Sequence, residues 1–280
     1  MKWRDTGRSS NLEDRRGGGG GRKAGIGIAG IVLALVISAV TGANPLEVLG
    51  VMSGGAGAPA ASEAPVEDAR EEPMVRFLSS ALDDAQAMWA QKLAAEGTAY
   101  PAAKLVLFRG AVQSACGDAS SAMGPFYCPG DQKVYIDLAF YEELSRNYGA
   151  PGDFAQVYVL AHEIGHHVQS VRGTESQLRR AQRADPGSEN ALSVRMELQA
   201  DCYAGVWANT VAQRGDLERG DMEEGLGAAA AVGDDRLQQQ AGREVRPESF
   251  THGSSAERMR WFKAGFDSGE PRSCDTFGAR

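Results

Sequence analysis

The pattern of apolar and polar positions divides the chain into four parts. Residues 1–23 are polar and glycine-rich, a composition that predicts a flexible tail. Residues 24–46 carry no charge and match the length of roughly 20 apolar residues that spans a bilayer, which predicts a transmembrane helix. Residues 47–73 are rich in Gly, Ala, Pro and acidic residues without periodicity, which predicts a tether. We expect one globular domain over residues 74–280.

The first half of the domain shows one long helix and two strands. Apolar residues recur at helical spacing from Val75 to Leu93. Residues 104–108 and 133–137 are predicted to be strands. We expect residues 133–137 to form an exposed edge, where an extended peptide could add as a further strand. A short helix is predicted at residues 139–146.

The second half of the domain is predicted to be helical. One apolar helix begins near Asp153, and another runs from Asn190 to Arg214, where Gly215 ends it. The polar stretch between them, residues 173–189, is expected to be a loop. Residues 225–232 are alanine-rich and predicted to be helical, and residues 233–248 are polar.

Near the carboxyl end, Ser254 and Glu257 have the spacing of a capping box that opens a last helix. Together these elements predict an α+β domain, mainly α, with a small sheet that has an antiparallel edge.

Charge sets an expected orientation for the apolar stretch. Basic residues precede residues 24–46 and acidic residues follow them, so the positive-inside rule places the N-terminus in the cytoplasm and the domain outside it. A cleaved signal peptide is the alternative, because Thr41-Gly42-Ala43 offers small residues to a peptidase. The net charge of -8 and the absence of a basic patch in the domain give no reason to expect nucleic-acid binding.

The four cysteines predict disulfides if the domain lies outside the cytoplasm. Of the three possible pairings, we expect Cys116 with Cys128 and Cys202 with Cys274. The alternative is four buried free thiols.

One short segment contains most of the candidate metal-binding and catalytic residues. His162-Glu163-Ile-Gly-His166 has the form H-E-x-x-H, which on a helix places both histidines on one face, where they can hold a zinc ion. Glu163 lies at the edge of that face and can reach a water molecule on the metal. Three of the four histidines in the chain fall in this apolar segment, where unpaired polar groups would be costly to bury. His167 is left without a predicted role.

A third ligand is expected on another helix, because catalytic zinc commonly has three protein ligands and one open position. Glu197 and Asp201 lie one turn apart among apolar residues. We assign Glu197 to the metal and Asp201 to the N–H of a ligand histidine.

Four runs of residues together resemble the neutral zinc metallopeptidases of bacteria. They are residues 2–17, His162 to Gln169, Glu197 to Gly205 and Thr251 to Arg258. The pair Glu197 and Asp201 is also similar to the Glu-x-x-x-Asp of gluzincin proteases. The resemblance implies a zincin-like fold, in which a small sheet with an edge strand lies above the motif helix. It also implies a place for His252 near the metal, where it would bind the oxyanion.

Three hypotheses follow. The first is a zinc endopeptidase that acts on peptides or proteins, held as a single-pass protein in the bacterial inner membrane with its catalytic domain outside the cytoplasm. Its zinc is bound by His162, His166 and Glu197, and Glu163 is the general base. The second is a non-hydrolytic envelope binding or assembly protein stabilised by zinc, although structural zinc needs no general base. The third is an iron enzyme, whose ligand types fit but whose helical spacing does not.

Overall fold

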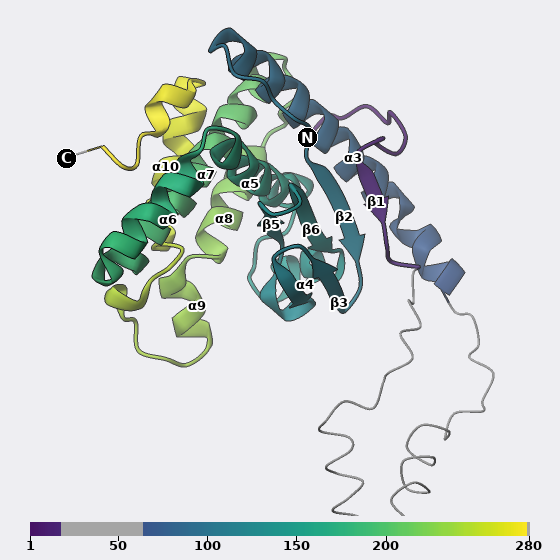
Figure 1. The fold of residues 1–280 in the computed structure, drawn as a ribbon. Coiled ribbons are helices and arrows are strands. Elements are labelled where there is room, and N and C mark those ends of the chain that lie inside the picture. Colours follow the sequence, from purple (N-terminus) through teal and green to yellow (C-terminus); the bar gives the residue numbers. More distant parts are fainter. Residues whose placement is uncertain (18–63, 279–280) are drawn as a thin grey trace, which may run out of the picture. The chain divides into compact units, whose positions relative to one another are not determined.

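The computed structural model describes residues 1–17 and 64–278, with the side chains of the second range described from residue 69 onward (Figure 1). The uncharged stretch at residues 24–46 lies outside the described residues. Among the helices that are described, none has the length and apolar character needed to cross a membrane. The described residues of Met1–Arg15 and Glu71–Arg280 form one compact unit, and those at 16–17 and 64–70 belong to a second.

The first unit is α+β and mainly helical, as predicted. Its strands are β1 (Leu12–Asp14), β2 (Lys104–Phe108), β3 (Ala111–Ser114), β4 (Gly117–Ser120), β5 (Phe126–Cys128) and β6 (Lys133–Asp137). Its α-helices are α3 (Ala64–Ala95), which begins in the second unit, α4 (Ala139–Arg146), α5 (Asp153–Val171), α6 (Thr174–Ala184), α7 (Glu189–Gln213), α8 (Asp221–Ala231), α9 (Asp234–Gln240) and α10 (Ser255–Ser268). Short 3-10 turns lie at Ser121–Met123, Pro186–Ser188, Pro247–Ser249 and Pro271–Cys274.

A four-stranded sheet has the order β1-β2-β6-β5, and β3 and β4 form a separate hairpin. The β1–β2 and β2–β6 pairs are parallel, whereas β5 runs antiparallel to β6. The predicted antiparallel edge therefore exists, but not at residues 133–137, which form the inner strand β6. Val134 and Tyr135 are both buried, although they point to opposite faces. The edge next to α5 is instead the short strand β5.

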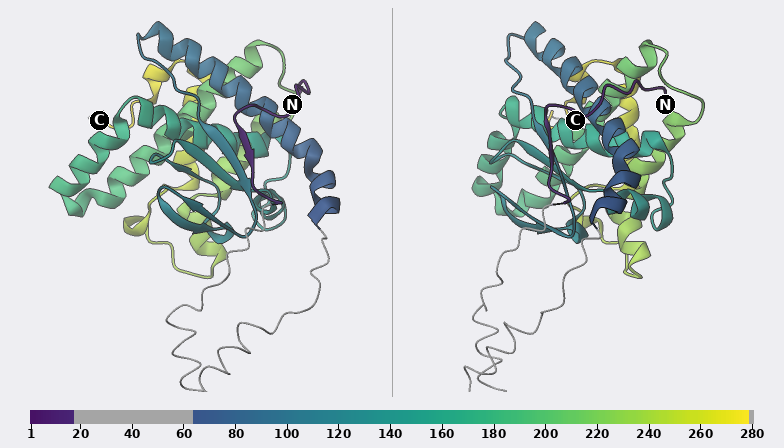
Figure 2. Two further views of the ribbon diagram at one scale, coloured as in Figure 1. Left: turned by 45° about the vertical axis from the view of Figure 1, so that its right-hand side comes forward. Right: turned by 90° about the vertical axis from the view of Figure 1, so that its right-hand side faces the viewer.

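Residues 1–15 differ from the predicted flexible tail. They contribute β1 to the sheet, and β1 lies beside β2 in both views of Figure 2. The Trp3 ring packs on Phe77 with 5.2 Å between centroids, and the Ser9 hydroxyl donates to Asp83. A polar segment can be ordered in this way because its main chain completes the ladder of an existing sheet, so it needs no core of its own.

Helices α5, α7, α8 and α10 pack together and carry most of the site described below. Glycines allow the closest approaches. A Cβ at Gly165 would lie 2.9 Å from the backbone oxygen of Ala200, so α5 and α7 approach closely there. A Cβ at Gly205 would lie 2.0 Å from the backbone oxygen of Phe262, so α7 and α10 are nearly in backbone contact.

Several boundaries differ from the predictions. Helix α3 begins at Ala64, inside the expected tether, because the charged and alanine-rich residues there favour helix. Residues 173–189 are not a loop: α6 lies within them, with Glu175 and Arg179 paired one turn apart. Helix α9 occupies the start of the polar stretch after residue 232. The capping box at Ser254 is confirmed.

Both predicted disulfides are present. Cys116 pairs with Cys128, and Cys202 pairs with Cys274. The first joins the β3–β4 hairpin region to β5, and the second joins α7 to the carboxyl end.

Candidate functional site

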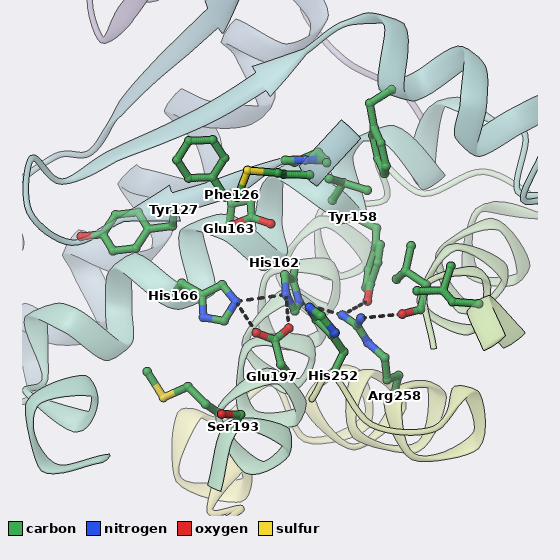
Figure 3. Close-up of a pocket in the computed structure, with 18 of the residues that line it drawn as sticks. Phe126, Tyr127, Tyr158, His162, Glu163, His166, Ser193, Glu197, His252 and Arg258 are labelled. Atoms are coloured by element: carbon green, nitrogen blue, oxygen red, sulfur yellow. Dashed lines mark hydrogen bonds and ion pairs between the residues drawn. The ribbon is translucent and has the colours of Figure 1, made fainter. Parts of the chain in front are cut away.

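Three predicted ligands converge at one point between α5 and α7. The Nε2 atoms of His162 and His166 are 3.2 Å apart. A carboxylate oxygen of Glu197 lies 3.2 Å from His162 Nε2, and the other lies 3.3 Å from His166 Nε2 (Figure 3). The one-turn spacing of the histidines aligns them on α5, and Gly165 allows α7 to bring Glu197 close enough.

The spacing of these atoms fits a zinc ion. Nitrogen or oxygen atoms about 2.0–2.1 Å from a tetrahedral ion lie about 3.3–3.4 Å from one another. The donor set also attracts positive charge. Burial lowers the pKa of His162, but Asp201 and Glu197 outweigh burial and raise that pKa to about 10. Burial raises the pKa of Glu197, but the two histidines outweigh it and hold that pKa well below its usual range.

Each ligand histidine is oriented by a hydrogen bond from its other ring nitrogen. The Nδ1–H of His162 donates to Asp201 over 2.8 Å, as predicted for that carboxylate. The Nδ1–H of His166 donates to the side-chain oxygen of Gln169 over 2.8 Å. The Nε2 atom of each ring is therefore the one that points toward a metal, which is the usual arrangement around metal histidines.

A fully buried arginine holds Asp201 in place. Arg258, on α10, donates from Nε and Nη2 to the two oxygens of Asp201 over 2.8 and 2.9 Å. The hydroxyl of Tyr158 also donates to Asp201. Burial opposes ionisation of Asp201, but Arg258 and His162 outweigh it and lower the pKa of that carboxyl. Asp201, on α7, is thus a charged acceptor held by groups from two other helices, α5 and α10.

Glu163 is buried beside the ligands with an unused oxygen. Its side chain is 6% exposed, and its Oε2 atom has no hydrogen-bond partner among the described residues. Burial raises the pKa of this carboxyl. A buried carboxylate oxygen without a partner is costly, which makes Glu163 a candidate for interaction with a molecule bound in the cavity.

His252 lies at the other side of the ligands, before α10 (Figure 3). Its Nδ1 lies 3.2 Å from a carboxylate oxygen of Asp234. Asp234 also accepts the backbone N–H groups of Thr251, His252 and Gly253, which fixes the loop. The bond to Asp234 raises the pKa of His252.

A cavity of about 680 Å³ adjoins these groups. His162, His166, Glu163, Glu197 and His252 all line it. Strand β5 forms part of its wall through Phe126 and Tyr127 (Figure 3). The cavity therefore brings an edge strand, a metal-binding set and a candidate general base together.

A second acidic group does not resemble a metal centre. Asp153, Asp221 and Glu224 have ligand atoms close to one another. The amino group of Met1 lies 2.8 Å from Asp153 and 3.3 Å from Asp221, so this group already holds a cation.

The structure brings together every site residue predicted from the sequence, and it adds four. Gln169 and Tyr158 lie on the motif helix and could have been sought at one-turn spacing from His166 and His162. Arg258 and Asp234 reach the site from other helices, and no local pattern identifies them.

This arrangement fits a zinc site, and comparison with known proteins agrees. The chain belongs to the family described as "Putative neutral zinc metallopeptidase", which matches residues 1–277. Zinc is the metal that this family implies. The family assignment made from the four sequence runs is therefore confirmed.

Two relatives show how far the likeness extends. The uncharacterized protein YpfJ of Escherichia coli strain K12 is 46% identical over 286 aligned positions, which cover 99% of each chain. The uncharacterized protein Mb2605 of Mycobacterium bovis is 48% identical over 191 positions, which cover 64% of each chain. No solved structure matched the chain.

Proposed function

We propose that the protein is a zinc-dependent endopeptidase that hydrolyses peptide bonds in peptides or proteins. One observation carries this proposal: three ligand atoms at zinc spacing lie beside a buried glutamate oxygen that has no partner. Structural zinc has four protein ligands and needs no such base. The site is thus suited to catalysis.

Different residues of the site have separate roles in the proposed reaction. His162, His166 and Glu197 would hold the ion, which supplies a water of lowered pKa and polarises the scissile carbonyl. Glu163 removes a proton from the attacking water and later passes it to the leaving amine. His252, positioned by Asp234, donates a hydrogen bond to the developing oxyanion.

The substrate is expected to bind along β5. Within the described part of the chain, this strand has a partner on one side only, β6, and it lines the cavity through Phe126 and Tyr127. An extended peptide can add to such an edge through main-chain hydrogen bonds. Strand β5 thus takes the role that the sequence suggested for residues 133–137.

The proposed location is outside the cytoplasm, at the bacterial inner membrane, with residues 24–46 as the anchor; a single crossing there would separate β1 from β2. The support is the pair of disulfides, because disulfides persist in oxidising compartments. Alkylation of intact cells before lysis tests the location, because free thiols react with the reagent and disulfide-bonded cysteines do not. Alkylation of all four cysteines in the native protein would contradict it.

The activity is tested with the purified full chain, by zinc content and by cleavage of a mixed peptide library. Wild type should hold one equivalent of zinc and cut. Glu163→Gln should keep zinc while kcat falls roughly 10²–10⁴-fold. Glu197→Ala should lose zinc. Glu143→Gln, at an exposed position in the wall of the same cavity, is the matched control and should behave as wild type.

Two results would contradict the proposal. One is undiminished cleavage by Glu163→Gln. The other is stoichiometric zinc without cleavage by any form, which would favour the non-hydrolytic binding protein.

A further inference from the structure

Strand β5 has only three residues, so it needs anchors beyond its ladder with β6. One face of the strand has two. The Phe126 ring stacks on Tyr135 with 4.8 Å between centroids. Cys128 is fully buried and bonded to Cys116. The Tyr127 side chain alternates to the opposite face, toward α5.

On that face, Tyr127 meets a buried histidine of the motif helix. The Tyr127 hydroxyl lies 2.9 Å from Nδ1 of His167, and His167 is fully buried. The Tyr100 ring meets the His167 ring edge-on, with 5.1 Å between centroids. His167 therefore fills the space between α5 and the sheet.

The chemistry of these contacts fixes the direction of each hydrogen bond. Nε2 of His167 lies 2.7 Å from the backbone oxygen of Pro101, which can only accept, so Nε2 carries the proton. In the neutral ring, Nδ1 is then an acceptor, and the Tyr127 hydroxyl donates to it. Burial lowers the pKa of His167, which agrees with a neutral ring.

Neighbouring positions on α5 connect the two regions. Successive residues of a helix point about 100° apart. His166 therefore faces Glu197, while His167 faces β5. One rigid helix thus carries a metal ligand and the contact that holds the edge strand.

We propose that His167 is a positioning residue that fixes the distance between the substrate-binding edge of β5 and the metal ligands. The inference rests on the proposed function. The geometry that carries it is the continuous path Pro101–His167–Tyr127, which ties the loop before β2, helix α5 and strand β5 together.

The first test is kinetic, with the full zinc-loaded protein and a peptide long enough to lie along β5. Tyr127→Phe removes the hydroxyl that donates to His167, together with its contact to Ser170. We expect KM to rise roughly fivefold, the ratio that one neutral hydrogen bond represents. kcat and zinc affinity should stay within about twofold of wild type. A merely structural defect would lower kcat and zinc content together.

A matched control and a double variant sharpen this test. The buried hydroxyl of Tyr100 has no hydrogen-bond partner among the described residues, so Tyr100→Phe should leave KM unchanged. His167→Leu should raise KM like Tyr127→Phe. The double variant should be no worse than His167→Leu alone, because that variant already removes the contact that Tyr127→Phe breaks.

The second test needs no activity, so failure of the proposed function is distinguishable from failure of this one. Hydrogen exchange of the native protein, followed by mass spectrometry, should speed up in the β5 segment of Tyr127→Phe but not in α7. Unchanged exchange in β5 would overturn the inference, as would a fall in kcat or zinc affinity without a rise in KM. Faster exchange in β5 with an inactive wild type would support the anchor and contradict the peptidase.

Discussion

His166 and His167 are adjacent on α5, yet the two sides of the helix give them opposite properties. On the metal side, burial opposes protonation of His166, but Glu197 outweighs it and raises its pKa. On the sheet side, burial lowers the pKa of His167, which faces a carbonyl and a tyrosine hydroxyl. The residue type is the same, and only the partners differ.

The difference shows how one helix can both carry metal ligands and hold an edge strand. The metal side is a network of charges. Arg258 is positive, and Asp201 and Glu197 are negative. His162 lies between the two carboxylates and carries positive charge once a cation is bound to it. The sheet side is neutral and depends on the shape and direction of single hydrogen bonds. A substitution on the metal side should therefore lower the free energy of unfolding far more than a substitution on the sheet side.

The largest expected effect comes from removing the buried cation of the metal side. Arg258→Met leaves Asp201 charged and without its ion-pair partner, so the free energy of unfolding should fall by about 3–5 kcal/mol. Zinc affinity should fall roughly 10–100-fold, because His162 loses its fixed acceptor. Chemical denaturation and competition with a chelator measure the two quantities.

Arg146→Met is the matched control for that variant. The Arg146 side chain is 76% exposed and pairs with Glu142 one turn away, so stability should change by at most about 0.5 kcal/mol. Equal zinc affinity in the Arg258 and Arg146 variants would show that Arg258 does not support the metal side.

A smaller effect should follow from forcing α5 and α7 apart. In Gly165→Ala the new methyl group would meet the backbone of Ala200 at 2.9 Å, and such overpacking costs about 1–3 kcal/mol. Zinc affinity should fall as well, because Glu197 moves away from the histidines. The variant should leave hydrogen exchange in β5 unchanged.

Gly227→Ala in α8 is the control for the added methyl group. A Cβ there meets nothing within 4 Å, so the change should stabilise the protein by about 0.5–1 kcal/mol. A loss of stability in the Gly227 variant equal to that in the Gly165 variant would contradict the close-approach argument.

The smallest expected effect is a shift in a pH profile. The hydrogen bond to Asp234 raises the pKa of His252 against burial; Glu197 adds to the rise and Arg258 opposes it. In the proposed mechanism the protonated form donates to the oxyanion, so kcat/KM should fall as pH rises through this pKa. The contribution of His252 to the free energy of unfolding changes with pH in the same direction. It is fully present below the unfolded pKa of His252 and is lost as pH rises through the raised pKa of the folded protein.

Asp234→Asn keeps an acceptor for the backbone but removes the charge. The alkaline fall in kcat/KM should then move to lower pH, while Asp235→Asn, which alters a neighbour bonded to Ser255, should leave it in place. A profile that does not move in the Asp234 variant would remove His252 from the proposed mechanism.

The sequence was sufficient for the features that depend on one-turn spacing. His162 with His166, and Glu197 with Asp201, are each four positions apart, so helical periodicity alone aligns each pair. The structure brings the two pairs together, and the metal and catalytic roles assigned to them remain predictions that the geometry fits. The family assignment and both disulfide pairings were also available from the residues.

The rest depends on contacts between elements that no local pattern specifies. Arg258 reaches Asp201 only because Gly265 lets α10 approach α7, where a Cβ would lie 1.9 Å from the backbone oxygen of Cys202. Strands β1 and β5 have three residues each, too few to show alternation. Their pairing comes from the longer strands beside them.

Strand β1 also constrains how the chain can be threaded through a membrane. β1 hydrogen bonds to β2, so the residues before and after the 24–46 stretch meet in one sheet. One bilayer crossing within that stretch would leave β1 in one compartment and β2 in the other. The orientation expected from charge, with the N-terminus inside and the domain outside, therefore requires β1 to be unpaired. A tag at the amino end, tested for protease access from outside the cell membrane, would report whether the sheet has four strands or three.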